Sequence, residues 1–159
     1  MLRLNRMTDY AIVVLSRLPV AGGRGTRTAQ VLAEDTGVPL PTVAKILKLL
    51  VQAGVVVSQR GAAGGYALAR PPERVSVADV IEALDGPIAI TSCVDGHAGS
   101  CEVEMLCPMR GNWDKVNQAI RQSLSAVSLI DMMLPAWQPA ATGAGASAGP
   151  PAARHLPAR

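Results

Sequence analysis

Apolar side chains near the start of the chain recur three and four residues apart, the spacing of one face of a helix. Thr8 is a suitable N-cap for this first helix, and Asp9 follows it at the electropositive end. The apolar stripe consists of Ala11, Ile12, Leu15 and Leu18. Pro19 and the AGGRG stretch after it end the helical pattern.

Two more helices are predicted on either side of Gly37, which marks a tight turn. Thr28 is a suitable N-cap for the first of them, which is expected to end near Asp35. Pro41 suits the first position of the second, where its missing N–H leaves no hydrogen bond unmade, and Gly54 ends that helix. The apolar stripe of the second helix consists of Val43, Ile46, Leu47 and Leu50. Two short helices around a glycine turn are typical of a helix-turn-helix.

Two β-prone runs follow in VVVSQRGAAGGYALAR, one on each side of the glycine-rich residues 61–65. This pattern predicts a β-hairpin, flanked by Arg60 and Arg70. A hairpin directly after a helix-turn-helix is the wing of a winged helix.

Ser76 and Asp79 predict a capping box at the start of the next helix, which is expected to end at Gly86. A longer helix is then expected from Asn112 to Leu134. Its apolar stripe consists of Trp113, Val116, Ile120, Leu124, Val127 and Ile130. About six turns is long for a helix that covers its own small domain, so a dimerisation helix is favoured over that alternative.

These elements predict a mainly α chain with a small β-hairpin wing. A winged helix-turn-helix DNA-binding domain is expected over residues 1–86 and a cysteine loop over 87–110. The dimerisation helix would occupy residues 111–134. Residues 135–159 are rich in Pro, Ala and Gly and are predicted to be disordered.

The net charge of +3 hides an asymmetry between the two halves of the chain. Residues 1–74 hold ten Lys/Arg and four Asp/Glu, whereas residues 75–159 hold five and eight. A basic half with a winged helix favours double-stranded DNA as the partner. The candidate DNA-binding residues are Arg27, Thr42, Lys45, Lys48, Arg60 and Gly64 at the wing tip. Each of these charges taken singly is more typical of a solvated surface, and it is the ordered combination of helix, turn, helix, hairpin and positive charge that favours DNA.

All three cysteines lie in one stretch, CVDGHAGSCEVEMLCP. The chain shows neither a signal peptide nor a segment long enough to span a membrane, so a cytoplasmic location is expected. Disulfides are rare in that compartment, and an odd number of cysteines argues against a disulfide framework. The C-x7-C-x5-C spacing matches neither a zinc ribbon nor a ferredoxin. An iron–sulfur cluster, a zinc ion and three unligated thiols all remain open on spacing alone.

Catalytic signatures are missing from the sequence, which contains no C-x-x-C motif and no glycine-rich loop that opens a helix. The glycines at 61–65 lie between strands and do not make a phosphate-binding loop. We therefore expect a protein that is not an enzyme and has no small-molecule substrate.

The chain resembles the winged-helix repressor family that contains the iron–sulfur regulator IscR and the nitric-oxide sensor NsrR. It is most similar to the branch that regulates the SUF system of iron–sulfur assembly. The resemblance covers about residues 1–134 and rests on four segments: LRLNRMTDYAIVVL, the wing RGAAGGYAL, VSVADVIEALDG and the three-cysteine loop.

This resemblance implies a homodimer that binds operator DNA, dimerises through the helix at 112–134 and carries one 2Fe-2S or 4Fe-4S cluster per subunit. By resemblance the cluster ligands are Cys93, Cys101 and Cys107. IscR has a fourth ligand, a histidine, three residues after its third cysteine, but Arg110 occupies that position here. In NsrR an aspartate from the first helix of the other subunit completes the cluster, and Asp9 matches that aspartate.

The fourth ligand therefore stays open. Asp9 has the alternative role of stabilising the start of its own helix. His97 is another candidate, and the loop also holds the carboxylates of Asp95, Glu102 and Glu104.

The function expected is a transcriptional repressor whose operator affinity depends on the cluster and therefore on iron, oxidant or nitric oxide. The alternative is a winged-helix regulator with zinc or with no cluster, which senses nitric oxide or redox state through its cysteines or does not sense at all. Whether the cluster-loaded or the cluster-free form represses stays open.

Overall fold

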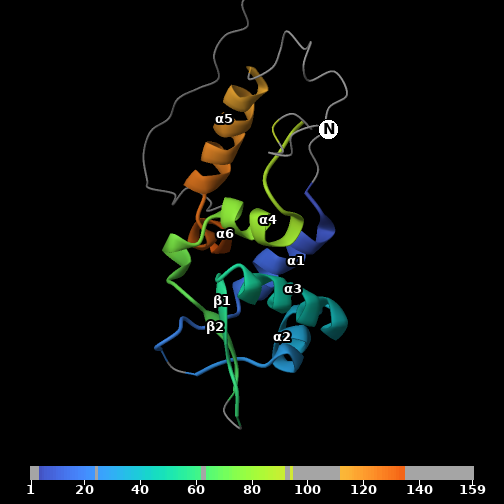
Figure 1. Cartoon of the computed structure of the whole chain (residues 1–159). Helices are drawn as coiled ribbons and strands as arrows, with labels where there is room; N and C mark the ends of the chain where they lie inside the picture. The colour runs from blue at the N-terminus through green and yellow to red at the C-terminus, as the bar shows by residue number, and fades with distance from the viewer. Residues whose placement is uncertain (1–3, 24, 62–63, 92–93, 95–111, 135–159) are drawn as a thin grey trace, which may run out of the picture.

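The computed structural model describes residues 4–23, 25–61, 64–91, 94 and 112–134. Its elements, in chain order, are α1 (Arg6–Leu15), α2 (Ala29–Thr36), α3 (Leu40–Gln52), β1 (Val56–Gln59), β2 (Gly65–Leu68), the 3-10 turn η1 (Pro72–Arg74), α4 (Val77–Asp85), α5 (Asn112–Ala126) and α6 (Leu129–Met133). The fold is mainly helical with one two-stranded antiparallel hairpin, as the sequence predicts (Figure 1). Residues 92–93 and 95–111 of the cysteine loop, which include the three cysteines and His97, and the tail from residue 135 lie outside the described residues.

Helix α1 begins earlier than the sequence predicts. Its N-cap is Asn5, whose side-chain oxygen accepts a hydrogen bond from the N–H of Met7 at 3.1 Å. Thr8 lies inside the first turn, is 1% exposed, and donates its hydroxyl to the carboxylate of Asp85 at 2.9 Å. The prediction of Thr8 as N-cap is therefore wrong, because a tertiary hydrogen bond engages its side chain.

The helix-turn-helix follows the predicted pattern. The Thr28 hydroxyl accepts from the N–H of Val31 at 3.3 Å and caps α2, and Gly37 ends α2 with φ of 71°. The predicted start of α3 at Pro41 is wrong by one residue: the helix begins at Leu40, after Pro39 at the N-cap, so Pro41 occupies its second position. All four predicted stripe residues of α3 are fully buried: Val43, Ile46, Leu47 and Leu50.

The wing is anchored along β2 by the loop that precedes α2. In the hairpin, Val56 pairs with Leu68 and Gln59 with Gly65. On the outer edge of β2, the N–H of Arg27 donates to the carbonyl of Tyr66 at 3.0 Å, and the N–H of Tyr66 donates back at 2.8 Å. The position of the wing is thus tied to the start of α2.

The predicted continuous helix from Asn112 to Leu134 is in fact two helices. Helix α5 ends at Ala126, and Ser128 caps α6 through a capping box with Asp131. The extended backbone between them pairs with the entry to α4: the N–H of Val77 donates to the carbonyl of Val127 at 2.9 Å. The return bond runs from the N–H of Leu129 to the carbonyl of Val75 at 2.6 Å. This pairing breaks the helix and brings α6 onto the winged-helix unit.

The core lies between α1, α3, α4 and the base of the hairpin, and it includes Leu129 of α6. Its fully buried larger side chains are Leu15, Leu32, Ile46, Leu47, Leu50, Leu68, Leu129, Val14, Val43, Val55, Val56 and Val75. By contrast, no residue of α5 is buried within the part of the chain that the structure describes. Helix α5 contacts α4 and extends away from the winged-helix unit (Figure 1).

None of the helices in the described ranges is long and apolar enough to cross a membrane.

Candidate nucleic-acid interface and its link to the cysteine loop

Helix α3 presents a cationic face to solvent. Its buried apolar stripe turns Lys45 and Lys48 outward, and both side chains are exposed. Thr42 is half-buried in the first turn, and its hydroxyl makes no hydrogen bond to the described residues. All three predicted α3 contacts therefore lie on or beside one face.

The start of α1 extends this face, which the sequence reasoning missed. A groove of about 420 Å³ runs between α1 and α3. It is lined by Asn5, Arg6, Met7, Tyr10, Pro41, Thr42 and Lys45. Arg6 is exposed there and brings a third cation next to Thr42 and Lys45. Recognising Asn5 as the N-cap would have placed Arg6 at the first helical position and exposed this signal.

The tip of the wing needs a glycine for a steric reason. A Cβ atom on Gly64 would lie 2.6 Å from the carbonyl oxygen of Gln59 and 2.7 Å from that of Gly61. The N–H of Gly64 also donates to the carbonyl of Gly61 at 2.9 Å, which closes the turn. Arg60, at the end of β1, is exposed beside this turn. Gly64 thus shapes the turn, and Arg60 supplies the charge.

Two arginines near the wing are already engaged within the fold. The guanidinium of Arg27 is ion-paired with Asp35 on α2, so a phosphate contact by Arg27 would compete with that pair. Arg70 lies 2.9 Å from the Asp79 carboxylate and donates to the carbonyl of Arg74 at 2.8 Å. Burial raises the pKa of Asp79, but hydrogen bonds from Ser76 and Arg70 outweigh burial and hold that pKa below its usual value.

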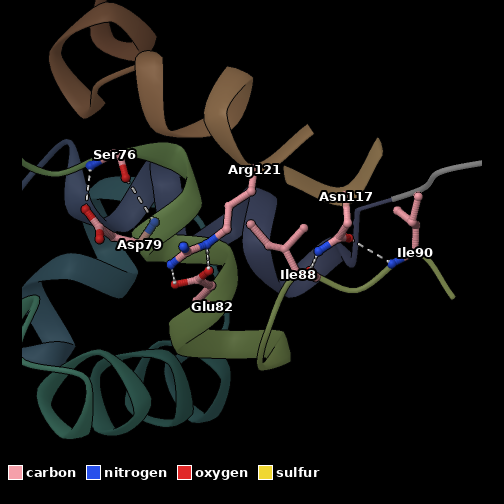
Figure 2. A network of polar contacts seen from close by, with 7 residues as sticks. All are labelled: Ser76, Asp79, Glu82, Ile88, Ile90, Asn117 and Arg121. Atoms are coloured by element: carbon pink, nitrogen blue, oxygen red, sulfur yellow. Dashed lines mark hydrogen bonds and ion pairs between the residues drawn. The ribbon is translucent and has the colours of Figure 1, made fainter. Parts of the chain in front are cut away.

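The root of the cysteine loop is fastened to α5 (Figure 2). The amide nitrogen of Asn117 donates to the carbonyl of Ile88 at 2.8 Å, and the amide oxygen accepts from the N–H of Ile90 at 3.2 Å. One turn further along α5, Arg121 makes a bidentate contact with the Glu82 carboxylate of α4: its Nε donates to Oε1 at 2.7 Å and its Nη2 donates to Oε2 at 3.3 Å. This contact with Glu82 raises the pKa of Arg121. Asn117 and Arg121 thus connect the chain just before Cys93 to α5 and then to α4.

The far end of α4 is connected to the start of α1. The carboxylate of Asp85 accepts from the hydroxyl of Thr8 at 2.9 Å and from the side-chain amide of Asn5 at 3.2 Å. Asp85 directly precedes Gly86, which opens the segment that leads to the cysteines. The first turn of α1 is therefore held by the residue at the entrance to the loop.

Asp9 is the only proposed cluster ligand within the described residues. It is exposed in the first turn of α1, and its carboxylate makes no hydrogen bond or ion pair with the described chain. It lines a cavity of about 590 Å³ together with Leu4, Asn5, Arg6, Thr8, Ile12, Val77 and Met132. Residues 4–23, 25–61, 64–91, 94 and 112–134 contain no group of three or more His, Cys, Asp or Glu placed to hold a metal ion.

A winged helix-turn-helix with a cationic recognition helix defines the chain as a DNA-binding transcriptional regulator. Residues 4–135 match the family model Rrf2, described as an iron-dependent transcriptional regulator. The chain belongs to the Rrf2 family.

Individual relatives agree with this family. The chain is 35% identical over 145 residues to an rrf2-like HTH-type transcriptional regulator of Rhodobacter capsulatus, covering 87% of this chain and 96% of that one. IscR of T. potens superposes with a TM-score of 0.56 at 28% identity, covering 83% of this chain and 86% of IscR. CymR, the global cysteine regulator of B. subtilis, superposes with a TM-score of 0.61 at 24% identity over 83% of this chain and 96% of CymR, a likeness of fold alone.

Proposed function

We propose that this protein is an iron–sulfur-responsive repressor that binds operator DNA as a homodimer and controls iron–sulfur assembly genes of the SUF type. The observation that carries the proposal is the placement of three cysteines in one loop whose root Asn117 fastens to α5. The match to an iron-dependent regulator family supports it. The SUF assignment rests on the resemblance of the sequence to that branch of the family.

The proposed ligands are the three loop thiolates, Cys93, Cys101 and Cys107. Thiolates are the ligands that iron–sulfur clusters favour, and one further donor is needed. Asp9 of a second copy is the preferred fourth donor, because its carboxylate is exposed and unengaged by the described chain. His97 is the alternative. A bound cluster supplies electron exchange and is lost when iron is scarce or when oxidant or nitric oxide attacks it.

Exposed apolar surface supports the proposed homodimer. No residue of helix α5 is fully buried within the described chain, and Trp113 and Val116 on its stripe are 43% and 44% exposed. A second apolar surface lies between α1 and α6, where a groove of about 310 Å³ is lined by Ile12, Val13, Ser16, Arg17, Met132 and Met133. We assign both surfaces to contact with a second copy, whose α5 would cover them.

The contacts on α5 provide a route from the loop to the DNA face. Asn117 holds the loop root, Arg121 holds Glu82, and α4 packs against α3 in the core. A dimer must place its two recognition helices about one DNA turn, ~34 Å, apart. A change at the loop root that shifts α5 would therefore alter operator affinity and leave the α3 contacts themselves unchanged.

The test starts with anaerobic purification, an absorption spectrum and assays of iron, sulfide and zinc on the same sample. Matched iron and sulfide are expected, with loss of both in Cys93→Ala, Cys101→Ala and Cys107→Ala. A colourless protein with stoichiometric zinc would instead support the zinc-bound alternative. A protein with neither metal would leave a cluster-free regulator.

Asn117→Ala tests the route. With DNA selected from a random pool by the parent protein, cluster removal is expected to change the parent's affinity about tenfold or more. The ratio of DNA affinities with and without the cluster should shrink towards one in Asn117→Ala. It should stay at the parent value in the control Gln118→Ala, which replaces an exposed neighbour on α5. An unchanged ratio in Asn117→Ala would contradict the route.

A further inference from the structure

The recognition helix exposes apolar side chains where base contacts are made. In the first two turns of α3, four side chains are exposed: Leu40, Pro41, Ala44 and Lys45. Leu40 is 40% exposed, whereas the four stripe residues of the same helix are fully buried. Leu40 therefore keeps a large part of its side chain outside the core, unlike the stripe residues.

The N-terminal residues of a recognition helix are the ones that contact base edges in the major groove. Polar discrimination there relies mainly on bidentate Arg, Lys, Asn or Gln, on acceptance by Glu or Asp, and on the hydroxyls of Ser or Thr. Residues 40–47 of α3 contain no Arg, Asn, Gln, Glu or Asp. Lys45 and Thr42 carry the only polar side-chain groups in these two turns.

We propose that Leu40, Pro41 and Ala44 form an apolar patch that contacts the 5-methyl groups of thymines, so that the operator half-site carries thymine at the contacted positions. Apolar side chains distinguish thymine by this contact, since no other base presents a methyl group in the major groove. The inference rests on the proposed operator binding through α3 and does not depend on the cluster.

The geometry of α3 supports one shared patch. Leu40 and Ala44 are four residues apart, and Pro41 and Ala44 are three apart, so these pairs are neighbours on the helix surface. Lys45 follows Ala44 directly, Lys48 lies one turn beyond it, and both are exposed, which suits contacts to the phosphates that border the groove. Charge then provides affinity, and the patch provides base discrimination.

The experiment uses DNA selected from a random pool by the full-length parent protein, resynthesised with uracil in place of every thymine. This exchange removes only the 5-methyl groups. Parent affinity is expected to fall about fourfold for each contacted methyl, as for burial of one methylene-sized group. The ratio of affinity for the thymine DNA to affinity for the uracil DNA should fall towards one in the double variant Leu40→Ala/Pro41→Ala. It should fall to a smaller extent in Leu40→Ala alone. Lys48→Ala, the control, should weaken binding to both DNAs and keep the parent ratio.

Equal parent affinity for the two DNAs would overturn the proposal, and so would a parent-like ratio in both patch variants with a native circular dichroism spectrum. These results are distinct from failure of the proposed function. A protein that selects no DNA defeats both, whereas a cluster-free protein with a large thymine-to-uracil ratio defeats only the cluster proposal.

Discussion

Thr8 and Asp85 share one hydrogen bond, but we expect removal of either partner to have very different effects. The Thr8 side chain is 1% exposed, whereas Asp85 lies at the exposed end of α4. Replacing Asp85 with Ala leaves a hydroxyl in the core without its acceptor. Replacing Thr8 with Val fills the same space with a methyl group and returns the carboxylate to water.

The burial of the hydroxyl sets the magnitudes. An unsatisfied buried donor costs about 1–3 kcal/mol, while an apolar replacement of similar shape is nearly neutral. Asp85→Ala also frees the Asn5 amide, which adds little because that group is exposed. We therefore expect a loss of about 1–2 kcal/mol for Asp85→Ala and less than about 1 kcal/mol for Thr8→Val. In the Thr8→Val background, Asp85→Ala should cost less than it does alone.

Urea unfolding of the parent, both single variants and the double variant measures these free energies from the midpoint and slope. Protein concentration must be equal in all four, because unfolding of a homodimer depends on it. If Thr8→Val lowered the free energy of unfolding as much as Asp85→Ala does, the hydrogen bond would not account for the difference between the two residues. Strictly additive losses in the double variant would likewise indicate that the hydrogen bond does not form.

Three further predictions follow from buried or sterically confined groups. Leu129→Ala should lower the free energy of unfolding by about 2–5 kcal/mol because the side chain is fully buried. Leu134→Ala, at a position 57% exposed directly after the same helix, should change it little, as urea titration will show. Gly64→Ala should distort the wing tip and weaken binding to the selected DNA in fluorescence anisotropy while the helical circular dichroism signal stays native, since its Cβ would lie 2.6 Å from a carbonyl oxygen. Burial raises the pKa of Asp79, but hydrogen bonds from Ser76 and Arg70 outweigh it, and hydrogen bonds from Ser128 lower the pKa of Asp131, so both pKa values lie below the usual 3.8. The two ionised carboxylates therefore contribute stability above pH 3.8, and this contribution is lost as the pH falls through the folded-state pKa values. Urea midpoints between pH 5 and pH 3 should therefore fall less steeply when both aspartates are replaced with Asn.

Local signals were sufficient to predict the helix-turn-helix and the wing. The cap at Thr28, the turn at Gly37 and the stripe of α3 each depend on residues within a few positions, so the pattern and the structure agree. The hairpin is similarly local, with its two strands separated by a short turn.

The errors came from contacts between distant segments. Thr8 looked like a cap, but its partner Asp85 lies 77 residues away. The apolar stripe of the predicted long helix continues through Val127, yet Ser128 begins a second capping box of the same S-x-x-D type as Ser76. Pairing with residues 75–77 then decides the break, and spacing along one segment does not reveal such pairing.

The candidate site was predictable only in part. Lys45 and Lys48 are exposed, as expected, whereas Arg27 is held by Asp35. The bonds made by Asn117 and Arg121 were missed because polar residues on an exposed helix usually face water, and their partners come from other elements.

The most direct test of the account is the affinity of one protein preparation for its selected DNA, measured anaerobically before and after removal of the iron and sulfide. The account predicts a change of about tenfold or more, with Cys93→Ala fixed at the cluster-free value. Equal affinities in both states, with the same affinity for Cys93→Ala, would contradict the claim that the cysteine loop controls DNA binding.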